Sequence, residues 1–447
     1  MKKTFVITAL IMVSICVKSQ TQRQWTLKDC IQYALDNSIA LKKSKLAKQS
    51  ATEDLKQAKA DLLPSISAST NQSVGYRPWT DAGVSTVTNG TVATSVKKSY
   101  YNGSYGLNFN WTVWNGNQNR NNVKLNRIAE EQAGLEWETT SNSIQEEITK
   151  LYIQMLYLKE TISVAEQSYE ASVKNEERGK ELLEIGKMSK ADMAQLTAQR
   201  SSDKYTLVNA KSTLSDYKSQ LKQLLELTGN EDFDIYFPTK SDESALVEIP
   251  QIQTVYEAAL AYRPEIKSSI LAIESSNTSL AIAKAGYLPS ISITGGGGTS
   301  STSMNSKNWG KQIKTNFDAS VGATISIPIS DNRKTKTAIN KAKIHQEESK
   351  LDLEDKKKQI YYTIDSYWLD ATTNQQKFIA AIDNVKSEEA SYELLSEQFR
   401  LGMKNIIELM NGKTNLMTAQ QNKLQSKYMT ILNILLLNFY KGNSIDL

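Results

Sequence analysis

The chain has 447 residues, a formal net charge of +5, two cysteines and one histidine. This near balance of charge gives no support to nucleic-acid binding, which requires a strong excess of clustered Lys and Arg. One of the two cysteines lies in an N-terminal segment that we expect to be removed, so an intrachain disulfide scaffold is excluded.

Residues 1–19 are predicted to form a cleaved signal peptide. Two lysines precede an apolar run from Phe5 to Val17, and these thirteen residues are too few to span a bilayer. Cleavage before Gln20 takes the basic count from 53 to 50 against 48 acids and leaves a net charge of +2. Lipidation at Cys16 stays open as an alternative, but Ile15 before it is not the small residue that lipoprotein processing requires.

The mature chain is an internal duplication. AKADLLPSIS at Ala58–Ser67 returns as AKAGYLPSIS at Ala283–Ser292, 225 residues later, and a second register of 216 residues relates Gly186 to Gly402. Self-similarity over such a length indicates two structural repeats that bury their apolar faces against each other or against another subunit. The expected parts are a signal peptide, a first repeat, a linker, a second repeat and a tail, at residues 1–19, 20–227, 228–251, 252–440 and 441–447.

Each repeat is predicted to run helix, strand, loop, strand, long helix, turn, helix. Proline is absent from 79–237 and 329–447, which permits very long helices. Apolar residues inside both tracts are spaced by alternate steps of four and three, the seam of a coiled coil. The seam residues are Ile144, Ile148, Leu151, Met155, Leu158, Ile162 and Ala165, and then Ile360, Ile364, Tyr367, Ala371, Asn374, Phe378 and Ala381, with Asn374 as the one polar interruption. One such run would suit an ordinary packed helix, but two favour an extended coiled-coil assembly.

Between the helices the apolar period changes from 3.5 to 2, which predicts strands with one apolar and one polar face. Weaker strands are expected from Ser65 to about Tyr76 and from Ser290 to about Thr299. The apolar faces are Tyr105, Leu107, Phe109, Trp111 and Val113 in the first repeat, and Val321, Ala323, Ile325, Ile327 and Ile329 in the second. A soluble sandwich would show a similar alternation. The export signal favours a membrane barrel with these residues toward lipid and Asn108, Asn110, Thr324 and Ser326 toward the lumen.

Four strands are too few to close a barrel around an interior, and an open sheet edge is not tolerated in lipid. If the strands cross a membrane, several chains therefore share one barrel.

No constellation for catalysis, cofactor binding or metal binding is predicted. His345, the only histidine, lies among Lys and Glu of a long helix without spaced partners. Gly295–Gly298 is not followed by the residues of a phosphate-binding loop, and we interpret it as flexible backbone at the end of a strand. The acidic doublets diverge on a helix and are expected to be solvated. We therefore expect no enzyme activity.

Two corners join the long helices to the helices that follow them. In each, an acid follows a glycine by six residues, namely Asp192 after Gly186 and Glu408 after Gly402. Glycine ends a helix, and Ser189 or Asn405 can cap the next one, so both segments are predicted to be helix-turn-helix corners. A further hypothesis places them at the far end of the helical body, where acids from several subunits would surround an axis.

These features together resemble the TolC-like outer-membrane efflux proteins, over about Trp25 to Tyr440. The resemblance rests on the duplicated helix pairs ending in LPSIS, on the strand exits NGN at Asn115–Asn117 and DNR at Asp331–Arg333, and on the two corners. It implies a mainly α fold with a membrane β-barrel portion. Long antiparallel coiled-coil helices form an α-barrel, and four strands per chain contribute to a trimeric, twelve-stranded β-barrel in the outer membrane.

The resemblance also implies roles for residues of the corners. Asp192 and Glu408 match aperture acids. Lys404 and Phe399 match a latch of the closed tip, and the family often has tyrosine at the position of Phe399. Asn411 occupies a position where a second ring acid can occur. The adaptor-facing helix tips would include Gly186, Ser189, Gly402 and Asn405.

The first functional hypothesis is a passive exit duct of the outer membrane, with a large periplasmic portion. It would serve a tripartite pump or a type I secretion system, together with a periplasmic adaptor (membrane fusion) protein and an inner-membrane transporter. The alternative is a secreted coiled-coil structural or adhesive protein without a pore. That alternative explains the heptads and leaves the two-faced strands without a role.

Overall fold

A computed structural model describes residues 24–79, 83–87, 90–94, 97–228, 233–238 and 240–447. The expected signal peptide lies outside them, as does part of the expected linker. The chain divides into two compact units. The helical unit comprises the chain up to Lys43, Glu138–Arg263 and Lys357–Leu447, and the strand-bearing unit comprises Ser44–Trp137 and Pro264–Lys356.

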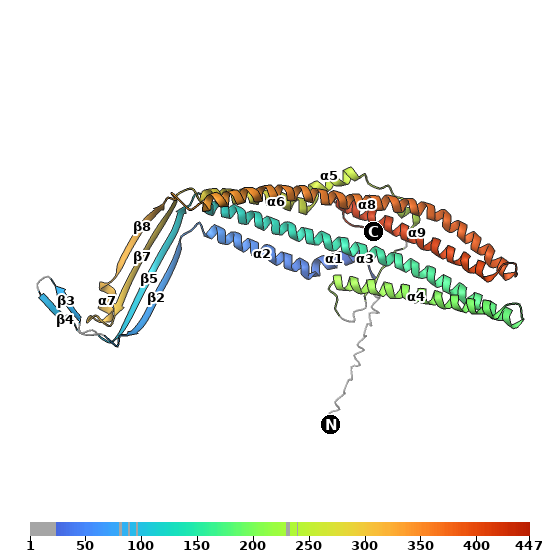
Figure 1. Cartoon of the computed structure of the whole chain (residues 1–447), viewed down its shortest axis with the longest axis horizontal. Helices are drawn as coiled ribbons and strands as arrows, with labels where there is room; N and C mark the ends of the chain where they lie inside the picture. The colour runs from blue at the N-terminus through green and yellow to red at the C-terminus, as the bar shows by residue number, and fades with distance from the viewer. Residues whose placement is uncertain (1–23, 80–82, 88–89, 95–96, 229–232, 239) are drawn as a thin grey trace, which may run out of the picture. The chain divides into compact units, whose positions relative to one another are not determined.

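Figure 1 labels the helices and strands in chain order. The helices are α1 (Leu27–Asn37), α2 (Ile39–Ala60), α3 (Gln118–Glu184), α4 (Lys190–Leu224), the 3-10 helix η1 (Asp242–Ala245), α5 (Ile252–Tyr262), α6 (Pro264–Ala285), α7 (Trp309–Thr315), α8 (Lys334–Arg400) and α9 (Ile406–Tyr440). The strands are β1 (Gln24–Trp25), β2 (Ser65–Tyr76), β3 (Gly83–Val87), β4 (Gly90–Thr94), β5 (Ser99–Trp114), β6 (Asp234–Ile235), β7 (Ser290–Thr302) and β8 (Asp318–Ser326).

The duplication is visible in the lengths of the elements. The helices α3 and α8 each have 67 residues, about 100 Å at 1.5 Å per residue, and α4 and α9 each have 35. The helix expected at the start of each repeat is instead a pair, broken at Ser38 and at Arg263. In the second repeat the break has a local cause, because Arg263 precedes Pro264 and a residue before proline disfavours the helical conformation.

The heptad seam lies in the core of the helical unit, which confirms the coiled-coil prediction. Ile148, Met155, Ile364, Ala371 and Phe378 have no exposed surface. The polar interruption at position 374 is half-buried. Leu151 and Tyr367 are also half-buried.

One four-stranded antiparallel sheet forms within the described residues, in the order β2-β5-β7-β8. Residues directly opposite each other share a face. Phe109 lies opposite Ile66 and Gly295, whereas Asn110 lies opposite Ser65 and Thr294. The register therefore gives the sheet one apolar and one polar face, as the alternation predicts.

Three details of the sheet differ from expectation. Gly295–Gly298 is not the end of a strand but lies inside β7, paired on both sides. A Cβ on Gly296 would lie 2.7 Å from the carbonyl oxygen of Leu107, so close strand approach accounts for that glycine. Ile327 lies just outside β8, which ends at Ser326, because Pro328 removes a backbone donor and restricts the residue before it. The hairpin β3-β4 and the helix α7 were not expected.

Among the described residues, no helix is both long and apolar enough to cross a membrane. The same part of the chain contains no group of three or more His, Cys, Asp or Glu placed to hold a metal ion. His345 is exposed, with Nδ1 3.4 Å from a carboxylate oxygen of Glu348. Cys30 is fully buried, and burial raises the pKa of its thiol to about 12.

Candidate functional site

The first corner joins α3 to α4 and has the predicted cap geometry. Gly186 adopts a φ of 70°, and its N–H donates to the carbonyl of Leu183 at 3.0 Å. The Ser189 hydroxyl accepts from the backbone N–H of Asp192 at 3.0 Å and donates to its carboxylate at 2.8 Å. Asp192 thus stands in the first turn of α4, where a negative charge is favoured by the helix dipole.

The second corner joins α8 to α9 and repeats this arrangement. Gly402 has a φ of 74°, and its N–H donates to the carbonyl of Phe399 at 2.9 Å. Asn405 and Glu408 form a reciprocal capping box, with backbone-to-side-chain distances of 2.9 and 3.3 Å. Both corners lie at the same end of the helical unit (Figure 1). The helix-turn-helix prediction is therefore correct at both.

The two acids are equivalent in the repeats, but their charge partners differ. Lys404 donates to Glu408 at 2.5 Å, and both side chains are more than a third exposed. This hydrogen bond, with that from the Asn405 backbone, holds the pKa of Glu408 below its ordinary value of 4.5. Lys404, in the turn before α9, is thus paired with the first turn of that helix, and its pairing with Asp192 stays a prediction.

Two further residues matched by the resemblance differ in exposure. Phe399 is half-buried and Asn411 is exposed. Their parts in a latch and in a second ring stay predictions.

The structure contains a buried ionic cluster near the corners that the sequence did not predict. Lys413 of α9 donates to the carboxylate of Asp203 on α4, to the hydroxyl of Ser172 on α3 and, at 2.6 Å, to the carbonyl of Ser168. The side chains of Lys413 and Asp203 are only 7 and 5% exposed. Burial lowers the pKa of Lys413, and the adjacent Asp203 carboxylate opposes that shift. The cluster joins α9 of the second repeat to α3 and α4 of the first.

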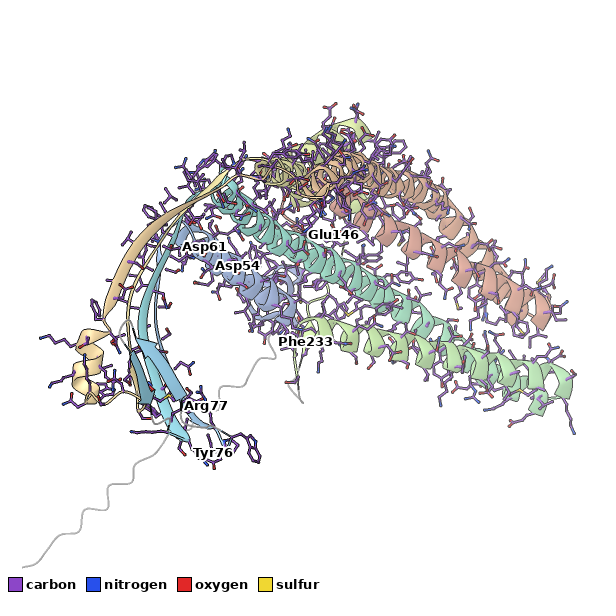
Figure 2. All side chains as sticks on the ribbon, turned by 60° about the vertical axis from the view of Figure 1, so that its left-hand side comes forward. Asp54, Asp61, Tyr76, Arg77, Glu146 and Phe233 are labelled. Carbon is purple, nitrogen blue, oxygen red and sulfur yellow. The ribbon has the colours of Figure 1, made fainter. Side chains whose placement is uncertain are left out.

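The apolar face of the sheet is the second candidate surface. Directly opposed apolar residues continue across the strands, for example Ile291 opposite Ile325 and Trp111 opposite Ile293. Large side chains on this face are solvent-exposed: Ile66 68%, Leu107 56%, Val321 84% and Ile325 64%. Figure 2 shows the span of the sheet, from Asp61 beside the start of β2 to Tyr76 and Arg77 at its far end. A contiguous exposed apolar surface of this kind requires lipid or another protein to cover it.

Comparison with known proteins gives a consistent result. Residues 30–230 and 255–435 match the family model described as "Outer membrane efflux protein". The chain is 22% identical over 431 residues to the outer membrane efflux protein BepC of Brucella suis, covering 95% of this chain and 87% of that one. It is 20% identical over 442 residues to the outer membrane protein TolC of Escherichia coli, covering 95 and 83%.

Solved structures of the same architecture are similar to the whole chain. The structure of CusC matches with a TM-score of 0.79 at 17% identity, covering 94% of this chain and 92% of that one. The CmeC outer membrane channel of Campylobacter jejuni matches with a TM-score of 0.77 at 19% identity, covering 93 and 86%. At these identities the likeness establishes the fold.

Proposed function

The chain belongs to the outer membrane efflux protein family, and on that premise we propose that it forms a passive export channel. The protein resides in the outer membrane and acts as the exit duct of an efflux pump. Service to a type I secretion system is the other use consistent with such a duct. The observation that carries the proposal is the two-faced sheet, whose exposed apolar face needs lipid.

The sheet also argues for assembly. Its outer strands, β2 and β8, each pair on one side only within the described residues. Open edges are not tolerated in hydrocarbon, and four strands cannot enclose an interior. We propose that three chains join β8 to β2 of the next chain and close a twelve-stranded barrel, with the polar face inside.

The partners follow from the same proposal. The duct would receive its cargo from an inner-membrane transporter through a periplasmic adaptor protein. The helix tips that would face this adaptor are Gly186, Ser189, Gly402 and Asn405. Lys404 and Phe399 would form a weak latch, with Lys404 exchanging Glu408 for the Asp192 of a neighbouring chain. Exposed ion pairs contribute only about 0 to 1 kcal/mol, which suits a contact that a partner must release.

Planar-bilayer recording tests the proposed function. The purified protein should produce discrete, stable conductance steps, and it should require detergent for extraction from membranes. A secreted coiled-coil structural or adhesive protein would give neither result. Extraction in buffer alone, with silent bilayers, would favour that alternative.

The acids at the corners give a separate prediction. If Asp192 and Glu408 converge from three chains, six carboxylates lie around one opening and favour cations there. The Asp192→Asn and Glu408→Gln double variant keeps the oxygen that accepts each cap hydrogen bond and removes the charge. We expect this variant to lower cation selectivity, measured as the reversal potential in a salt gradient.

The matched control removes the same charge from the same two hairpins, away from the corners. Asp216 of α4 and Asp370 of α8 are exposed, so Asp216→Asn with Asp370→Asn should leave selectivity unchanged. If the corner variant keeps the cation selectivity of the unaltered protein, Asp192 and Glu408 act only as helix caps and do not set the selectivity of the channel.

A further inference from the structure

The short helix α7 packs on the apolar face of the sheet. It follows β7 at the strand end away from α6 (Figure 1). The Trp309 ring meets the Tyr105 ring edge-on, with centroids 6.2 Å apart, and the Thr299 hydroxyl donates to the carbonyl of Ile313 at 2.7 Å. Tyr105 and Thr299 are directly opposed, on the face that also carries Leu107. The helix therefore lies on the side of the sheet for which we propose contact with lipid.

Hydrogen bonds from Gln312 and Asn316 to β7 and to the segment before the helix fix its orientation. Gln312 is 4% exposed, and its amide donates to the carbonyls of Thr302 and Lys307 at 3.0 and 2.7 Å. Its oxygen accepts from the Thr302 N–H at 2.8 Å. At the other end, Asn316 donates to the carbonyl of Ser300 at 2.7 Å. The opposite side of α7 is consequently held outward.

The exposed surface of this segment is basic, with the Trp309 ring at its edge against the sheet. Lys307, Lys311 and Lys314 are exposed, and Trp309 is 57% exposed. No acidic residue occurs between Ser303 and Phe317 to neutralise the three lysines. Lys97 adds a fourth amine nearby, since it donates to the carbonyl of Ser303 at 2.9 Å.

The position along the strand sets the depth of this surface in a membrane. On the apolar face, Phe109 of β5 pairs with Gly295 of β7, and Leu107 pairs with Gly297. The contacts of α7 lie farther along β7, from Thr299 to Thr302. At about 3.4 Å per residue, the helix lies about 1.4 to 2.4 nm beyond the pair at Phe109, toward the end of β7 away from α6. Tryptophan and lysine at the edge of an apolar band are typical of the membrane–water interface.

We infer that the α7 surface, formed by Lys307, Trp309, Lys311 and Lys314, binds the phosphate groups of anionic lipid headgroups on the outside of the barrel. This inference rests on the proposed membrane channel, which places the apolar face toward lipid. Lysine amines supply the charge for phosphate, and the indole inserts beside the acyl chains. A lipid is favoured over a soluble anion because the surface lies on the lipid side of the sheet.

Native mass spectrometry of the detergent-purified protein tests the inference, with diphosphoryl lipid A as the probe. Each lysine near an anionic surface contributes a factor of about five, so the Lys307→Gln, Lys311→Gln and Lys314→Gln triple variant should bind the lipid on the order of a hundredfold more weakly. The matched control replaces three exposed lysines of the helical unit, Lys174, Lys377 and Lys386, by glutamine. It should bind as the unaltered protein does.

Two further probes separate the sources of binding. The same lipid without its phosphates should bind weakly to the unaltered protein, and inorganic phosphate at millimolar concentration should not displace lipid A. Equal binding of the triple variant, equal binding of the phosphate-free lipid, or displacement by free phosphate would each overturn the inference. Bilayer conductance of the triple variant separates the two claims, because retained conductance with unchanged lipid binding contradicts only the inference.

Discussion

Replacing Asp203 by alanine should lower the free energy of unfolding by about 3 to 5 kcal/mol, because it leaves the Lys413 charge buried without an opposite charge to compensate it. Asp203 is 5% exposed and accepts from Lys413, from Ser172 and, at 3.0 Å, from Gln199. An unpaired charge costs far more free energy when it is buried than when it is exposed to water. Chemical denaturation followed by circular dichroism measures the change.

Two controls isolate the buried charge as the cause. Asp216→Ala, at an exposed position of the same helix, should change stability by less than about 1 kcal/mol. Adding Lys413→Met to Asp203→Ala should recover most of the loss, since an apolar replacement of a buried pair is often neutral or stabilising. If Asp203→Ala unfolds at the same denaturant concentration as the unaltered protein, the cluster does not fasten α9 to the first repeat.

Arginine at position 109 should cost about 2 to 4 kcal/mol if Phe109 faces the middle of the bilayer. The adjacent variant Asn110→Arg is the matched control, because Asn110 lies on the opposite, polar face of the same strand. The yield of assembled protein in isolated membranes should fall sharply for Phe109→Arg and change little for Asn110→Arg. Equal yields would contradict the assignment of the two faces.

Much of the fold could be predicted from periodicity, because each pattern acts locally. The steps of four and three that mark Ile148 and Ile364 reflect helices whose buried side repeats every 3.5 residues, and both residues have no exposed surface. The alternation around Phe109 reflects a strand whose side chains point to opposite faces, and the sheet register confirms it. The glycine and cap residues of the corners encode the turn directly, as at Gly186 and Ser189.

Features that depend on long-range packing could not be predicted. Lys413 and Asp203 are 210 residues apart, and neither has a neighbour in sequence that marks it as buried. The position of α7 on the sheet depends on contacts of Thr299, Tyr105 and Gln312, which come together only once β5 and β7 have paired. The sequence did not predict that Gly295–Gly298 lies inside a strand, because glycine weakens a strand locally. In the structure, pairing with β5 and β8 on the two sides holds this segment extended.

The candidate site shows the same division. The sequence identified both corner acids, and the structure places each at the same cap position of its helix. The role proposed for them at an axis depends on how chains assemble, because Asp192 and Glu408 of one chain are satisfied by their own helix termini. The assembly state is therefore the premise on which the aperture, the latch and the closed barrel all depend.

The mass of the detergent-purified protein, measured with the detergent contribution removed, tests this premise most directly. Three chains per particle are predicted, because four strands with two open edges cannot close a barrel alone. A monodisperse particle containing a single, fully folded chain would contradict the account.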